Sequence, residues 1–95
     1  MPRIITRIQR IVAVEPYKVT CLFGDNAVKT LDFGDYLNQR SDKPLIKPLL
    51  NPAYFMNVTL DELGGLQWPN GFDCSPLAAY ELGTPVNALS ELSNA

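Results

Sequence analysis

The amino-acid sequence predicts an α+β domain: an antiparallel β-meander plus a second β-hairpin, with short helices covering one face. The strands are indicated by apolar residues that alternate with polar ones on both sides of two short turns, at residues 24–26 and 61–65. The helices are indicated by Asn51 and Ser75, each of which is followed by a proline. A capping side chain before proline is typical of a helix start, because proline suits the first helical position.

Three predicted strands follow one another in the first third of the chain. Residues 4–14 are rich in β-branched side chains, and Pro16 ends this strand because proline cannot donate to a β-ladder. In the second strand, residues 17–23, one face carries Tyr17, Val19, Cys21 and Phe23. After the turn Gly24-Asp25-Asn26, residues 27–33 return beside them. Consecutive strands joined by short turns make a meander.

Short helical segments are predicted between the meander and the second hairpin. Residues 35–37 can form a single helical turn, and residues 38–44 are polar and loop-like. The next apolar residues, spaced for one helical face but interrupted by Pro48, are Leu45, Ile46, Leu49 and Leu50. Asn51 then caps a short turn that begins at Pro52. We expect these two apolar patches to cover the open face of the meander.

The second hairpin is predicted from residues 58–60 and 66–68, which brings the expected number of strands to five. Ser75 then caps a helix over residues 77–82, and Gly83 suits the position just past its end. Residues 1–83 are therefore expected to form a single domain. Residues 84–95 are expected to be a short C-terminal tail, either frayed or one helical turn that starts at Thr84-Pro85.

The charged residues are distributed unevenly along the 95-residue chain. Eight Lys and Arg stand against ten Asp and Glu, a net charge of −2, which argues against a general nucleic-acid binder. All eight basic residues lie between Arg3 and Lys47, whereas residues 51–95 carry five acidic residues and no basic ones. Either the two halves pack with their charges facing each other, or the surface is bipolar and favours association with another copy or a partner.

The composition also excludes several kinds of chemistry. The chain has no histidine, which removes Ser-His and Cys-His nucleophilic pairs, and its two cysteines, Cys21 and Cys74, cannot form a structural zinc site alone. Asp73 next to Cys74 would raise the pKa of that thiol. We expect no catalysis, no cofactor and no metal. Without a signal peptide or an apolar stretch of membrane-spanning length, a cytoplasmic protein with reduced thiols is expected.

The run Trp68-Pro69-Asn70-Gly71-Phe72-Asp73 is the candidate interaction surface, with Trp68, Pro69, Asn70, Gly71 and Asp73 as its candidate residues. Proline presets the backbone for a turn, asparagine tolerates left-handed geometry and glycine accepts almost any angle. Tryptophan suits an interface anchor. A purely structural turn, with Trp68 in the core, is the alternative interpretation, and the sequence leaves both open.

Several motifs occur in the order of a known family. They are residues 17–26 (YKVTCLFGDN), 31–33 (LDF), 49–55 (LLNPAYF), 64–73 (GGLQWPNGFD) and 75–77 (SPL). From about Ile11 to Leu82 the chain resembles the small bacterial family catalogued as domain of unknown function 2442. The family usually has Asp-Gly at the first hairpin, where this chain has Asp25-Asn26, and asparagine also tolerates that conformation.

The resemblance implies a compact α+β domain, found alone or joined to a helix-turn-helix segment, for which few residues remain after Leu82. It also implies a second small protein encoded nearby, as in toxin–antitoxin pairs. We therefore predict a non-catalytic protein-interaction or regulatory module, antitoxin-like and homodimeric through exposed sheet edges. One alternative is a nucleic-acid-associated regulator that uses the basic first strand, with Arg3 and Arg7 on one face. The other is a small-ligand binder under Trp68 and Tyr80.

Overall fold

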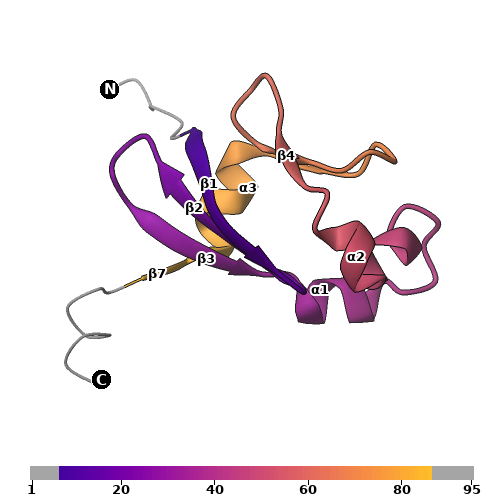
Figure 1. The fold of residues 1–95 in the computed structure, drawn as a ribbon. Coiled ribbons are helices and arrows are strands. Elements are labelled where there is room, and N and C mark those ends of the chain that lie inside the picture. The colour runs from indigo at the N-terminus through magenta and orange to yellow at the C-terminus, as the bar shows by residue number, and fades with distance from the viewer. Residues whose placement is uncertain (1–6, 87–95) are drawn as a thin grey trace.

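The computed structural model describes residues 7–86 and confirms the predicted α+β class. Figure 1 shows the meander on the left, with the helix of residues 76–82 against it, and the other short helices on the right. In chain order the elements are β1 (Ile8–Glu15), β2 (Lys18–Phe23), β3 (Val28–Asp32), α1 (Gly34–Gln39), the 3-10 helix η1 (Lys47–Leu50), α2 (Pro52–Phe55), β4 (Thr59–Leu60), β5 (Leu66–Gln67), β6 (Asp73–Cys74), α3 (Pro76–Leu82) and β7 (Thr84–Pro85).

The predicted meander is confirmed, and it forms most of a four-stranded antiparallel sheet in the order β1-β2-β3-β7. β2 and β3 pair with Val19 opposite Leu31 and Cys21 opposite Lys29. The turn between them holds Asn26 at a φ of 74°, a left-handed conformation that asparagine tolerates. The inner face of β2 is buried at Val19, Cys21 and Phe23, as its alternating pattern predicts.

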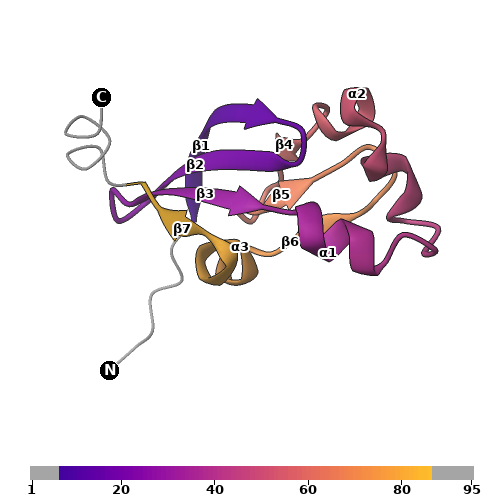
Figure 2. The same ribbon diagram turned by 90° about the horizontal axis from the view of Figure 1, so that it is seen from below.

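The prediction of a frayed tail or a helical turn at residues 84–95 is wrong at its start. Thr84 and Pro85 form β7, which pairs with β3 at Thr30 and Lys29, and the Val86 N–H donates to the Val28 carbonyl at 2.8 Å. The edge of β3 presents backbone groups that need partners, and an extended tail supplies them. Figure 2 shows β7 beside β3. Residues 87–95 of the predicted tail lie outside the described residues.

The predicted second hairpin is confirmed as β4 and β5, but it belongs to a three-stranded sheet in the order β4-β5-β6. Leu66 pairs with Cys74 and Gln67 with Asp73. The expected five strands are therefore seven within residues 7–86. β6 and β7 have two residues each, which is too short for an alternating pattern to show in the sequence.

The short helices pack against the meander at two places: α3 lies against β3, and α1, η1 and α2 gather at one end of the strands (Figures 1 and 2). Asn51 caps α2, because its side-chain oxygen accepts a hydrogen bond from the Ala53 N–H at 3.0 Å. The fully buried Phe55 ring of α2 packs edge-on against Tyr17 and Phe33, with ring centroids 5.5 and 5.9 Å apart. This cluster is part of the buried core, which also includes residues of both sheets.

Helix α3 is fastened to the meander by Tyr80. Its ring meets Phe23 edge-on at 5.0 Å and lies 3.4 Å from the Lys29 Nζ, and its hydroxyl donates to Asp25 at 2.6 Å. That hydrogen bond lowers the pKa of the Asp25 carboxyl group. Gly83 follows the helix where predicted, and a Cβ there would lie 2.7 Å from the Lys29 Cβ. Glycine is therefore required for close approach to β3.

Candidate functional site

Trp68, the first residue of the predicted interaction surface, lies in the core. Its side chain is 3% exposed, and its indole N–H donates to the Phe55 carbonyl at 2.9 Å. Its ring contacts the rings of Phe33, Phe55 and Phe72 at centroid distances of 5.7, 5.4 and 5.5 Å. Trp68 therefore has the structural role that the sequence left open as the alternative.

The rest of the turn is held in shape by Asn70. Its side-chain nitrogen donates to the Leu45 carbonyl at 3.0 Å, and its side-chain oxygen accepts from the Phe72 N–H at 3.2 Å. Gly71 has a φ of +97°, which strains any other residue. Pro69, Gly71 and Asp73 are exposed, while Asn70 is half-buried. The turn thus presents these three residues on a rigid frame, and their role in binding stays a prediction.

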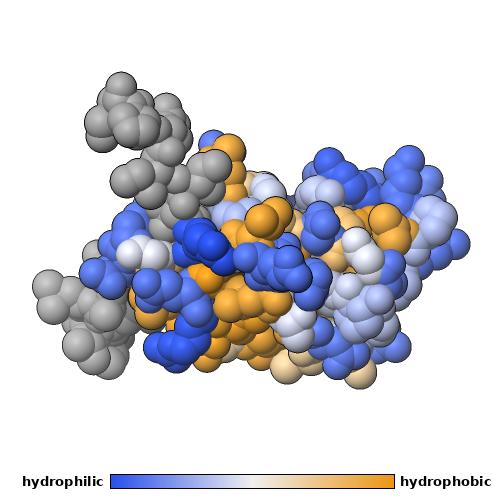
Figure 3. Space-filling view, turned by 90° about the horizontal axis from the view of Figure 1, so that it is seen from above, coloured by the Kyte–Doolittle hydropathy of each residue, from blue (hydrophilic) through white to orange (hydrophobic). Residues whose placement is uncertain are grey.

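A second surface lies between α3 and the tip of the β4–β5 hairpin. We name it the α3–hairpin groove: a hollow of about 350 Å³ lined by Arg7, Leu63, Ser75, Pro76 and Leu77. Leu63 is 72% exposed and Leu77 is 47% exposed. The hairpin tip is at the top of Figure 1, and the view from above in Figure 3 shows hydrophobic residues across the middle of this face with polar residues around them.

The hairpin tip that presents Leu63 is fixed by several hydrogen bonds. The Asp61 carboxylate accepts from the Leu63 and Gly65 N–H groups at 2.8 and 2.9 Å. Just before β1, the Arg7 guanidinium donates to the Glu62 carbonyl at 2.7 Å, and the N–H of Ile8, the first residue of β1, donates to the Gly64 carbonyl at 2.9 Å. Leu63 is therefore exposed on a preorganised loop.

The part of the chain that supplies Leu63 and Leu77 carries only acidic charges. Residues 51–86 carry Asp61, Glu62, Asp73 and Glu81 and contain no Lys or Arg. Glu81 lies one helical turn after Leu77, so the two share a face of α3. Arg7 is the basic residue of the lining, and it bonds to the hairpin backbone. Glu62 next to Leu63 and Glu81 on the Leu77 face of α3 favour a partner whose apolar segment also carries basic residues.

The two thiols are unsuited to act as nucleophiles. Burial, and then proximity to Cys74, raises the pKa of Cys21 to about 12. Burial, and then the charges of Asp73 and Asp61, raises the pKa of Cys74 to about 11, the direction expected from the neighbouring acid. Both thiols are therefore protonated at neutral pH, and the thiolate is the reactive form. Within residues 7–86, no three His, Cys, Asp or Glu side chains gather to hold a metal ion.

Comparison with protein-family models, with curated proteins and with solved structures found no match. Of the helices in the described part of the chain, none has the length and hydrophobicity needed to cross a bilayer. The candidate site thus rests on the geometry of this chain.

Leu63 and Leu77 are the surface residues that the sequence analysis missed. Leu63 interrupts an otherwise polar turn, Asp61-Glu62-Leu63-Gly64-Gly65, and a large apolar residue at an exposed turn was the available signal. Leu77 had no such signal, because a leucine in a short amphipathic helix is as readily assigned to the core.

Proposed function

We propose that this chain is a non-catalytic protein-interaction module that binds a partner protein through the α3–hairpin groove. The observation that carries this proposal is the exposure of Leu63 and Leu77 on the two sides of an apolar hollow. Exposed apolar patches with a polar rim often mark interaction sites. The rigid hairpin tip adds to this argument, because a preorganised surface loses less conformational entropy on binding.

The occupant that fits this groove best is a partner segment with apolar side chains flanked by Lys or Arg. Its apolar side chains would enter between Leu63 and Leu77, and its cations would meet Glu62 and Glu81. On the motif resemblance, we further propose membership of the domain of unknown function 2442 family. The partner would then be the second protein of a cytoplasmic, antitoxin-like pair.

The groove is tested by site-specific crosslinking in the native host, with the photoreactive residue p-benzoylphenylalanine at position 63. Position 56 is the control, because Met56 is also exposed, at 45%, and does not line the groove. The captured protein is then purified, and its Kd is measured for wild type, Leu63→Asp, Leu77→Asp and Met56→Asp. Folding of each variant is checked by circular dichroism.

We expect one partner to crosslink at position 63, with its crosslinked peptide carrying apolar and basic residues. Both groove variants should bind about 30-fold more weakly, the effect of losing a central anchor, while Met56→Asp binds as wild type. Higher salt should weaken binding, because the charges are complementary. No capture at position 63, or an equal loss in Met56→Asp, would contradict the proposal.

Self-association is a second candidate, favoured by the position of β1. It is the outer strand of the four-stranded sheet, eight residues long, with Val12 45% exposed. Pairing of two β1 edges would give a homodimer. Light scattering should then give a dimeric mass for wild type and a monomeric mass for Val12→Lys, because an edge lysine opposes pairing. A monomeric wild type would exclude this dimer.

A further inference from the structure

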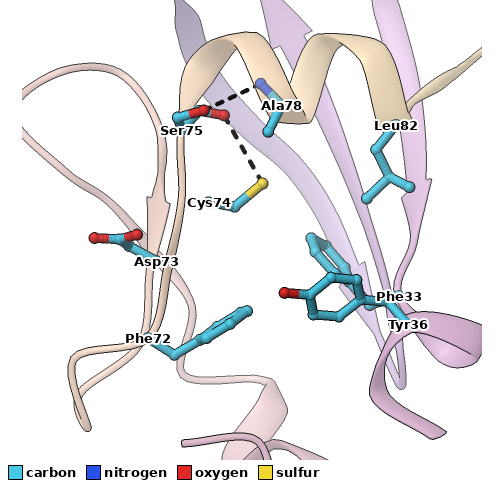
Figure 4. Close-up of a pocket in the computed structure, with 8 residues that line it drawn as sticks. All are labelled: Phe33, Tyr36, Phe72, Asp73, Cys74, Ser75, Ala78 and Leu82. Atoms are coloured by element: carbon cyan, nitrogen blue, oxygen red, sulfur yellow. Dashed lines mark hydrogen bonds between the residues drawn. The ribbon is translucent and has the colours of Figure 1, made fainter. Parts of the chain in front are cut away.

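A second hollow lies against a different face of α3, and the side chains that line it differ in chemical character from those of the α3–hairpin groove. We name it the aromatic pocket; its volume is about 240 Å³. Ala78 and Leu82, four residues apart on α3, form one wall. Figure 4 shows the lining, of which the argument uses Phe33, Tyr36, Phe72, Cys74, Ala78 and Leu82.

The side chains directed into the aromatic pocket carry no charge. In Figure 4 the Phe72 ring, the Tyr36 hydroxyl and the Cys74 sulfur point into the hollow, while the Asp73 carboxylate points away from it. The Cys74 thiol is protonated at neutral pH and lies 3.8 Å from the Ser75 carbonyl, its acceptor. None of the residues that line the pocket is a cation, so an anion placed among them would lose its hydration without gaining a charged partner in the lining.

Tyr36 supplies a fixed polar group in this apolar surrounding. The Arg40 guanidinium lies 3.9 Å from the centre of the Tyr36 ring and donates to the Tyr36 carbonyl at 3.3 Å, which holds the residue in place. Among the described residues, the Tyr36 hydroxyl has no hydrogen-bond partner. It is therefore free to bond to a ligand.

We propose that the aromatic pocket binds a small, uncharged aromatic compound of one or two rings that carries a hydrogen-bonding group for Tyr36. The rings of Phe33, Tyr36 and Phe72 provide aromatic contacts on its walls. The volume of the pocket limits the size of the ligand that it can hold. A dry apolar cavity of about 150 Å³ holds benzene, whereas sites for drug-sized ligands start at about 300 Å³. A hollow of about 240 Å³ lies between them.

Three matched probes test the proposal by fluorine NMR at neutral pH: 4-fluorophenol, fluorobenzene and 4-fluorobenzoate. All three contain one fluorinated ring: 4-fluorophenol also carries a hydroxyl, 4-fluorobenzoate carries a negative charge, and fluorobenzene carries neither. The chain has one tryptophan, and Trp68 contacts Phe33 and Phe72 behind the pocket wall, so its indole N–H signal reports occupancy. We expect 4-fluorophenol to bind with a Kd on the order of 1 mM or tighter. Fluorobenzene should bind more weakly and 4-fluorobenzoate at least about tenfold more weakly than 4-fluorophenol.

Three variants assign the binding to this pocket. Ala78→Leu fills the hollow from α3 with a good helix former and should abolish binding of 4-fluorophenol. Ala53→Leu, a change at an exposed alanine of α2, is the matched control and should leave the Kd unchanged. Tyr36→Phe keeps the ring and removes the hydroxyl, so it should weaken 4-fluorophenol by about threefold to tenfold and leave fluorobenzene unaffected.

The proposal is overturned if no probe binds saturably, if Ala78→Leu leaves binding intact, or if 4-fluorobenzoate binds as tightly as 4-fluorophenol. A fourth outcome also overturns it and concerns the occupant. If Ala78→Leu weakens binding of the captured partner protein and none of the three probes binds, the pocket receives a side chain of that partner instead of a small compound. These results are independent of Leu63 and Leu77, so the α3–hairpin groove and the aromatic pocket can fail separately.

Discussion

The N-terminal meander and the second half of the chain are held together by different interactions. In the meander, β1, β2 and β3 are five to eight residues long; β2 and β3 pair in an unbroken register, and β1 pairs with β2 over its whole length with two register shifts. In the second half, β4, β5 and β6 have two residues each. Strands of this length provide few ladder hydrogen bonds, so other groups must fix the backbone there.

Those other groups are single side chains bonded to the backbone. The side chain of Asn51 bonds to the backbone of Ala53, and that of Asp61 bonds to the backbone of Leu63 and Gly65. In the same way Trp68 bonds to Phe55, Asn70 bonds to Leu45 and Phe72, and Ser75 bonds to Ala78. Side-chain bonds of this kind replace secondary structure where the chain turns. Most residues that line the α3–hairpin groove and the aromatic pocket come from this half, and Arg7, Phe33 and Tyr36 complete the two linings from the N-terminal half. The comparison therefore predicts that single substitutions destabilise the second half more than the meander.

The largest expected effect is that of Trp68→Ala. It leaves a cavity among three aromatic rings and removes the indole bond to Phe55, which should lower the free energy of unfolding by about 3–5 kcal/mol. Urea unfolding followed by circular dichroism measures it, since the variant has no tryptophan. Lys18→Ala, at an exposed position of β2, is the control and should change stability by less than about 0.5 kcal/mol. Similar losses in both variants would contradict the comparison.

The next largest loss in the free energy of unfolding is expected for Asp61→Ala, because one carboxylate oxygen of Asp61 accepts hydrogen bonds from two backbone N–H groups in the hairpin tip. Their loss should cost about 1–3 kcal/mol. Asp32→Ala is its counterpart at the end of the meander, where the carboxylate accepts a single bond from the Gly34 N–H. We expect about 0.5–1 kcal/mol there. The same urea measurement compares the two, and an equal or larger loss at Asp32 would refute the ranking.

Substitutions at Asn26 test the turn of the meander, because Asn26 is the one non-glycine residue with a left-handed φ among the described positions. Asn26→Ala should destabilise by about 1 kcal/mol, because a Cβ without a compensating polar group is strained at positive φ. Asn26→Gly removes the strain but adds freedom to the unfolded chain, so it should lie within about 0.5 kcal/mol of wild type. Thermal unfolding distinguishes these results; an alanine variant as stable as the glycine variant would show that this turn is not held at its left-handed φ.

Near neutral pH the smallest expected effect is that of ionising the two thiols, because this effect develops only in alkaline solution. Folding raises the pKa of Cys21 to about 12 and of Cys74 to about 11 from the ordinary value of 9.0. The stability that accompanies these shifts is fully present below pH 9 and is lost as pH rises, because the unfolded thiols ionise first. The urea midpoint should therefore fall between about pH 8 and about pH 10.5. In the Cys21→Ala, Cys74→Ala double variant the fall should be shallower, and an identical slope would exclude the thiols as its cause.

The features that the sequence predicted correctly are local ones. The Asn26 turn, the caps at Asn51 and Ser75 and the alternating residues of β2 depend on neighbours within a few positions. The features that it missed depend on distant partners. β7 is a strand because β3 lies beside it, and the expected helix at Thr84-Pro85 had only local signals in its favour.

The candidate site shows the same division. The sequence indicated a rigid turn at residues 68–73, and the turn is rigid. It left open whether Trp68 faces a partner or the core, because an aromatic residue after an apolar strand is compatible with both. Burial decided this only when Phe33, Phe55 and Phe72 came together around it.

By itself, the sequence determined the α+β class, the meander, the helix starts and the absence of histidine chemistry, because each follows from residue type and short-range spacing. Only the tertiary structure decided that Leu63 and Leu77 flank one groove and that Tyr36 and Cys74 face one pocket. These residues are 14 and 38 positions apart, respectively. Their meeting depends on how α1, α3 and the second sheet pack around a shared core, which no local pattern records.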